Sequence, residues 1–118
     1  MASPRVLLLL PPLTQLNTPY PSTAYLTGFL QSRNIAVEQA DLGIEMVLRL
    51  FSPEGLRHIF QQLHGLERSL PREALGMMRA EHSYVGMIGP VVAFLQGKRS
   101  DLASYLIQPR VLPQGPRF

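Results

Sequence analysis

The first apolar segment of the chain is short and bounded by proline on both sides. Residues 6–10 are apolar at every position, and they lie between Pro4 and the pair Pro11-Pro12. A run of this length without polar positions is typical of a central strand in a parallel sheet. Because proline has no N–H to donate to a sheet ladder, the double proline predicts where the strand ends.

A helix is predicted after a polar, proline-containing loop over residues 13–21. Ser22 is the expected N-cap, since its hydroxyl can accept from the first free backbone N–H groups. Apolar residues then recur at helical spacing, at Tyr25, Leu26, Phe29 and Leu30. Gly28 has two interpretations: it allows a close approach to the sheet, or it is a tolerated glycine that costs about 1 kcal/mol relative to alanine.

A second strand is predicted after a turn at Arg33-Asn34. Residues 35–39 alternate between an apolar and a more polar face, and Asp41 follows them. Strand, helix and strand in this order predict a right-handed, parallel βαβ unit. Asp41 could bind a ligand hydroxyl, as acidic residues do at this place in dinucleotide-binding folds, or cap the next helix, which we favour.

The chain from Gly43 onward is predicted to be mainly helical. Apolar residues recur there every three or four positions, and residues 109–118 form a proline-punctuated tail without periodicity. Helix starts are expected at Ser52-Pro53-Glu54, at Ser69 to Glu73 and at Ser100-Asp101. Gly65 is the expected end of one helix, and Gly89-Pro90 is expected to break or kink another.

These patterns predict an α/β fold. Residues 1–42 are expected to be the βαβ start of a cofactor-binding domain, residues 43–108 a helical region of the same domain, and residues 109–118 its tail. Two parallel strands leave both sheet edges unpaired, whereas doubly wound sheets have four or more strands. Three explanations stay open: further strands beyond Phe118, a second copy of the chain, or a strand count that is too low.

The amino-acid composition argues against two classes of function, nucleic-acid binding and membrane insertion. The sequence is 46% hydrophobic and 16% charged, which is typical of a folded protein with some apolar surface for a partner. The net charge of +3 is carried almost entirely by arginines scattered along amphipathic helices, so nucleic-acid binding is not expected. No segment approaches the roughly 20 apolar residues that span a bilayer. We expect a cytoplasmic protein that does not bind a membrane.

The sequence offers little that could bind a metal ion or act as a catalytic nucleophile. The sequence has no cysteine, which excludes disulfides and thiolate ligation within this chain. The three histidines show no metal-binding spacing: His58 and His64 are expected on solvent-facing helix positions, and His82 in the core with a hydrogen bond. No site of catalysis is predicted.

The loop over residues 11–22 is the candidate binding site. Ligands of open α/β sheets bind beyond the carboxyl ends of the strands, where this loop is expected. A rigid connector is the alternative. The glycine patterns that bind dinucleotides or nucleoside triphosphates are absent from the sequence.

Four segments together resemble a known family. They are Arg5-Val-Leu-Leu-Leu-Leu-Pro-Pro, Gln15-Leu-Asn-Thr-Pro-Tyr-Pro-Ser, Tyr25-Leu-Thr-Gly-Phe-Leu and Val37-Glu-Gln-Ala-Asp-Leu-Gly. In this order they are similar to the start of the cobalamin-binding domain of radical SAM proteins. The resemblance covers residues 5–51, and the helical remainder fits an inserted region of such a domain less specifically.

The resemblance implies a partial flavodoxin-like, or Rossmann-like, βαβ unit that binds cobalamin. It also implies a downstream barrel that holds an iron–sulfur cluster and SAM, and the cysteines of that barrel are absent from this chain. The cobalamin motif Asp-x-His-x-x-Gly is absent as well, so no histidine is assigned as an axial ligand. The residues expected to contact the cofactor are Pro12, Leu13, Thr14, Gln15, Asn17 and Tyr20.

The expected function is therefore that of a non-catalytic, N-terminal fragment of a cobalamin-binding module. Its partners would be the remainder of the parent radical SAM protein and, in a homodimer, a second copy. Alone, it is expected to bind cobalamin weakly or not at all. The alternative is a protein-interaction or dimerisation domain without a cofactor.

Overall fold

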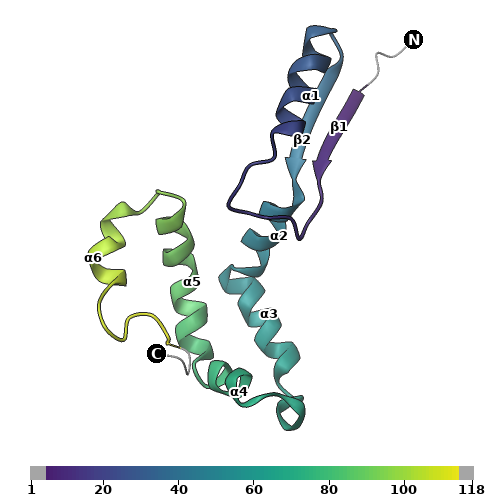
Figure 1. Ribbon diagram of the computed structural model, residues 1–118. Helices are drawn as coiled ribbons and strands as arrows, with labels where there is room; N and C mark the ends of the chain where they lie inside the picture. The colour runs from purple at the N-terminus through teal and green to yellow at the C-terminus, as the bar shows by residue number, and fades with distance from the viewer. Residues whose placement is uncertain (1–4, 115–118) are drawn as a thin grey trace. The chain divides into compact units, whose positions relative to one another are not determined.

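A computed structural model describes residues 5–114 (Figure 1). The α/β prediction is confirmed. The described elements are β1 (Arg5–Leu10), α1 (Pro21–Ser32), β2 (Ala36–Asp41), α2 (Leu42–Leu50), α3 (Pro53–Leu63), the 3-10 turn η1 (Glu67–Ser69), α4 (Arg72–Arg79), α5 (Glu81–Leu95), the 3-10 turn η2 (Ser100–Leu102) and α6 (Ala103–Leu106). The chain divides into two compact units between Val47 and Leu48.

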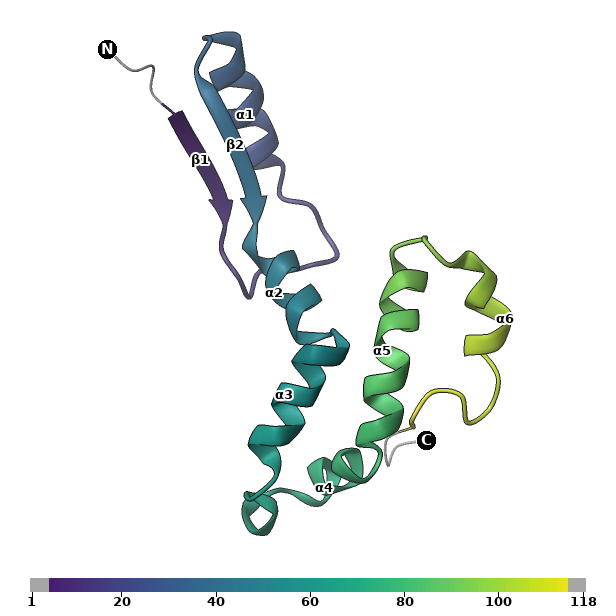
Figure 2. The ribbon, with the colours of Figure 1, turned by 180° about the vertical axis from the view of Figure 1, so that it is seen from behind.

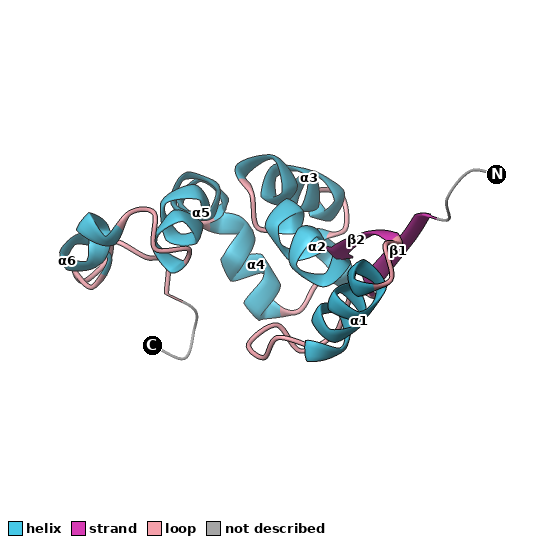
Figure 3. Ribbon diagram, turned by 90° about the horizontal axis from the view of Figure 1, so that it is seen from above, coloured by secondary structure: helices cyan, strands magenta, loops and turns pink. Residues whose placement is uncertain are grey.

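The first unit is the predicted βαβ unit. β1 and β2 pair in parallel, with Val6 opposite Val37 and Leu10 opposite Asp41. They are the only strands in residues 5–114. α1 returns the chain along one side of this pair, as the views from the front, behind and above agree (Figures 1, 2 and 3). Both strands therefore end at the same edge of the sheet, and the loop over residues 11–20 leaves from that edge.

One face of the sheet is covered within this unit and the other is not. Alternate residues of β1 are half-buried, whereas Leu7 and Leu9 are 59% and 49% exposed. The guanidinium of Arg5 donates to Oε1 of Glu38 at 3.1 Å on the same, uncovered face. β1, which is apolar from Val6 to Leu10, thus has a central-strand sequence, but only one of its faces and one of its edges has a neighbour in the described residues.

One local prediction about α1 is wrong, and one of the two interpretations of Gly28 is excluded. The helix begins at Pro21, so Ser22 lies inside the first turn, and the capping position is Tyr20, whose side chain makes no capping bond. Proline is favoured at the first helical position because its φ is already helical and its missing N–H would have no partner there. A Cβ built on Gly28 meets no atom within 4 Å, so the close-approach interpretation fails and the tolerated glycine remains.

The second unit is built around the antiparallel pair of α3 and α5. The predicted start of α3 is confirmed, since Ser52 Oγ accepts from the N–H of Gly55 at 3.0 Å. Its predicted end is confirmed too, because Gly65 has a φ of +97° directly after the helix. Phe60 is only 4% exposed and lies against Tyr84 of α5.

Two other predictions in this unit need correction. α5 continues through Gly89-Pro90, so the break, one of the two expected alternatives, does not occur. His82 is exposed in the first turn of α5 rather than buried in the core. The half-buried stripe of α5 includes Val85 and Ile88. It does not extend one turn further back to His82.

Candidate functional site

A pocket of about 390 Å³ lies at the carboxyl edge of the sheet in the first unit. We call it the carboxyl-edge pocket. The ends of both strands, the loop after β1, the first turn of α1 and the start of α2 contribute to it. Its lining residues are Leu10, Gln15, Leu16, Asn17, Thr18, Pro19, Tyr20, Thr23, Ala24, Gln39, Ala40, Asp41 and Ile44.

Half of the residues expected to bind a cofactor line this pocket. Gln15, Asn17 and Tyr20 do, whereas Pro12, Leu13 and Thr14 do not. Leu13 is 88% exposed and adopts a φ of +67°. Side chains along an irregular loop do not alternate between two faces with a fixed period. The sequence therefore could not show which of the six residues line the pocket.

Thr14 supports the loop instead of lining the pocket. Its Oγ1 donates to the carbonyl oxygen of Pro11 at 3.3 Å. It also lies 3.3 Å from the place where a Cβ of Gly43 would stand. Gly43 is buried, so its missing side chain lets the loop approach the start of α2 closely.

Asp41 has the structural role that the sequence favoured. Its Oδ1 accepts from the backbone N–H of Ile44 at 3.0 Å and so caps α2. The carboxylate also lines the pocket. One of its two oxygens is already engaged in the hydrogen bond that caps α2. Gln39 and Thr23, which the sequence analysis did not single out, line the pocket because β2 and α1 place them there.

The polar groups of the carboxyl-edge pocket are mainly neutral amides and hydroxyls. Asp41 carries the single carboxylate of the lining, and the amides and hydroxyls come from Gln15, Asn17, Thr18, Tyr20, Thr23 and Gln39. The lining contains no lysine, arginine or histidine. Such a pocket can recognise amide and hydroxyl groups by hydrogen bonds, but it offers no cationic side chain to a phosphate.

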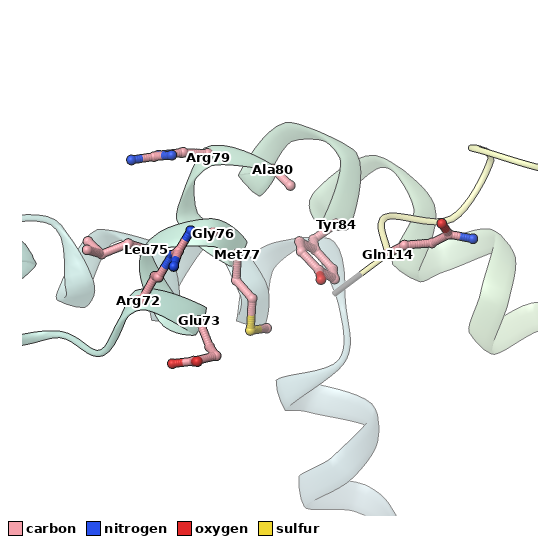
Figure 4. A pocket seen from close by; sticks show the side chains of 9 residues that line it. All are labelled: Arg72, Glu73, Leu75, Gly76, Met77, Arg79, Ala80, Tyr84 and Gln114. Atoms are coloured by element: carbon pink, nitrogen blue, oxygen red, sulfur yellow. The ribbon is translucent and has the colours of Figure 1, made fainter. Parts of the chain in front are cut away.

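A second pocket, of about 530 Å³, lies between α4, α5 and Gln114 in the second unit. Arg72, Glu73 and Arg79 line it, and their charged groups point in different directions rather than toward one point (Figure 4). A small ligand would therefore meet no convergent set of polar groups there.

Residues 5–114 contain no group of three or more histidine, aspartate or glutamate side chains placed to hold a metal ion. Nor does any helix in this range combine the length and apolar character that crossing a membrane requires. Comparison with known proteins gives no relative: no family model, no curated protein and no solved structure matches the chain.

Proposed function

We propose that the first unit is the opening part of a cobalamin-binding module. The observation that carries this proposal is the position of the carboxyl-edge pocket, at the end of two parallel strands and beside the first turn of the connecting helix. Open α/β sheets bind their cofactors at this edge. The choice of cobalamin among cofactors rests on the family resemblance of residues 5–51.

The residues of the pocket fit the periphery of cobalamin. The corrin ring carries amide side chains, and the amides of Gln15 and Asn17 can both donate to and accept from such groups. Leu10, Leu16 and Ile44 add apolar surface for the ring. A volume of about 390 Å³ takes one part of so large a cofactor, and further strands of a parent protein would hold the rest.

This chain would bind and orient the cofactor but would not ligate its metal. None of His58, His64 and His82 lies in the pocket lining. When bound, cobalamin supplies the chemistry of its cobalt–carbon bond. Catalysis, together with the iron–sulfur cluster and SAM, would belong to a cytoplasmic parent radical SAM protein, and this chain would be non-catalytic by itself.

Nuclear magnetic resonance of the chain tests the proposal even if binding is weak. Hydroxocobalamin at about millimolar concentration, where dissociation constants up to that range become visible, is added to the labelled chain. We expect the side-chain amide signals of Gln15 and Asn17 to shift, together with backbone signals near Asp41. The double variant Gln15→Ala, Asn17→Ala lacks these side-chain amides, and it should also lose most of the backbone shifts near Asp41.

Gln31→Ala is the matched control, since this glutamine lies at the other end of α1 and outside the carboxyl-edge pocket. It should leave the response unchanged. Absence of shifts at the pocket, or equal shifts in the double variant, would remove these residues from any cobalamin site.

A second candidate function is a protein-interaction or dimerisation domain without a cofactor. The specific observation is exposed apolar surface: Phe60, at 4% exposure, is the only large hydrophobic residue in residues 5–114 that is buried. In α1, Tyr25 and Phe29 are 78% and 56% exposed. Apolar surface of this kind marks contact with a partner, whether the remainder of a parent protein or a second copy.

A further inference from the structure

His64, the C-cap residue directly after α3, lies between carboxylates from two other segments. Its Nε2 lies 2.8 Å from Oε2 of Glu81, the first residue of α5, and its Nδ1 lies 3.5 Å from Oε1 of Glu67 in η1. The other oxygen of Glu67 accepts from the N–H of Gly65 at 2.7 Å. We call His64, Glu67 and Glu81 the His64 clamp.

Both ring nitrogens of His64 face a carboxylate oxygen. The number of hydrogen bonds that the ring can donate therefore depends on whether it is protonated. A neutral imidazole has one N–H and can donate to only one of the two carboxylates. The imidazolium has two N–H groups and can donate to both. The arrangement is therefore complete only in the protonated form.

The surroundings favour that form. The pKa of His64 is raised above its ordinary value, mainly by the hydrogen bond to Glu81 and to a smaller extent by the nearby carboxylate of Glu67. The backbone N–H groups of Glu67 and Gly65 lower the pKa of the Glu67 carboxyl, which keeps it ionised as an acceptor.

We propose that the His64 clamp is a proton-controlled fastening between the end of α3 and the start of α5. The two helices run antiparallel, with Gly89 of α5 near Pro53 at one end and Phe60 against Tyr84 further along. The clamp joins the remaining end of the pair, where the chain leaves for η1 and α4. Loss of the proton removes one of its two contacts and loosens this end.

Other basic side chains lie near Glu81. Arg57 of α3, Arg79 of α4 and His82 of α5 line a shallow hollow of about 400 Å³ together with Glu81. Arg57 also pairs with Glu54 at 3.6 Å. Arg68 is the cation next to Glu67 in η1. Because His82 is a second imidazole beside Glu81, its ring signals must be separated from those of His64.

The sign of the pH effect follows from the raised pKa of His64. A group whose pKa is higher in the folded state stabilises that state below its unfolded pKa. The contribution is lost as the pH rises through the folded-state pKa. The clamp is thus closed in mildly acidic solution and weakened in alkaline solution.

Titration of the histidine ring signals of the full chain tests the clamp, with assignments from His58→Gln and His82→Gln. We expect Glu81→Gln to lower the pKa of His64 and Glu67→Gln to lower it less, because the bond to Glu81 is the shorter one. Glu73→Gln, an exposed acid in α4, is the matched control and should leave it unchanged.

Amide hydrogen exchange supplies the conformational readout. The N–H of Tyr84 bonds to Ala80 at the start of α5, and that of His64 bonds to Phe60 at the end of α3. Below the pKa of His64, both amides should exchange about two- to fivefold more slowly in the wild type than in His64→Gln, as expected for one exposed ion pair. Above it, the difference between the two proteins should become smaller, because the neutral imidazole keeps only one of the two contacts.

Two results would overturn the proposal. One is a His64 pKa that does not change in Glu81→Gln. The other is an exchange ratio between wild type and His64→Gln that is the same on both sides of that pKa. Neither result bears on cobalamin binding, because the clamp and the carboxyl-edge pocket share no residue.

Discussion

The ring of Phe60 lies 6.3 Å from the ring of Tyr84, with the two planes inclined by 37°, and this contact joins α3 to α5. Phe60 is 4% exposed, so its removal leaves a cavity with few neighbours able to fill it. We expect Phe60→Ala to lower the free energy of unfolding of the second unit by about 3 kcal/mol, measured by urea denaturation.

Phe51→Ala is the control for this prediction, since Phe51 is 50% exposed in the same unit. It should lower the free energy of unfolding by about 1 kcal/mol or less, because little apolar area is returned to water. Equal losses in the two variants would show that Phe60 is not the centre of this packing.

Replacement of glycine by alanine is expected to change stability in opposite directions at Gly55 and at Gly76. A Cβ on Gly55 would collide with the carbonyl oxygen of Arg49 and lie 2.6 Å from that of Leu50, and neither backbone atom can move without distorting the turn into α3. A Cβ on Gly76 in α4 meets nothing within 4 Å. Thermal denaturation should show a lower melting temperature for Gly55→Ala.

Gly76→Ala should raise the melting temperature, since alanine is favoured over glycine in a helix by about 1 kcal/mol. A destabilised Gly76→Ala protein would mean that this face of α4 packs against something. A Gly55→Ala protein as stable as the wild type would contradict the tight turn between α2 and α3.

Self-association is expected because, within residues 5–114, nothing pairs with the outer edges of the two strands and Leu7 and Leu9 stay exposed. Light scattering of the purified chain at micromolar concentration should give a mass above the 13.2 kDa of one chain. Leu7→Lys should shift the population toward the monomer, because a charge on an edge strand opposes pairing. A clean monomer in the wild type would rule out the homodimer and favour self-sufficient helical packing.

The chain should not assemble an iron–sulfur cluster or cleave SAM. It has no cysteine, so no thiolate is present to hold the iron. Reconstitution with iron and sulfide, followed by iron and sulfide analysis, checks this expectation. A near-stoichiometric cluster would contradict the ligand argument.

Much of the local structure could be predicted from the sequence. The apolar run before Pro11-Pro12, the turn at Asn34, the start at Ser52-Pro53 and the stop at Gly65 each depend on residues within about one turn of each other. The cap of α2 by Asp41 is of the same kind, since its acceptor and donor are three residues apart. Backbone sterics and nearby hydrogen bonds decide such features, and both are written into short stretches of sequence.

Only the tertiary structure decided which side chains meet across longer distances. His64 and Glu81 are 17 residues apart, and they touch because α3 and α5 pack antiparallel. Gln15 and Gln39 share one pocket because β1 and β2 end at the same edge, while Leu13 in the same loop stays in solvent. Helical periodicity placed His82 on the apolar stripe, but the stripe does not say where the neighbouring helix ends. These contacts depend on the relative positions of whole elements, which arise from many weak packing interactions and not from any local pattern.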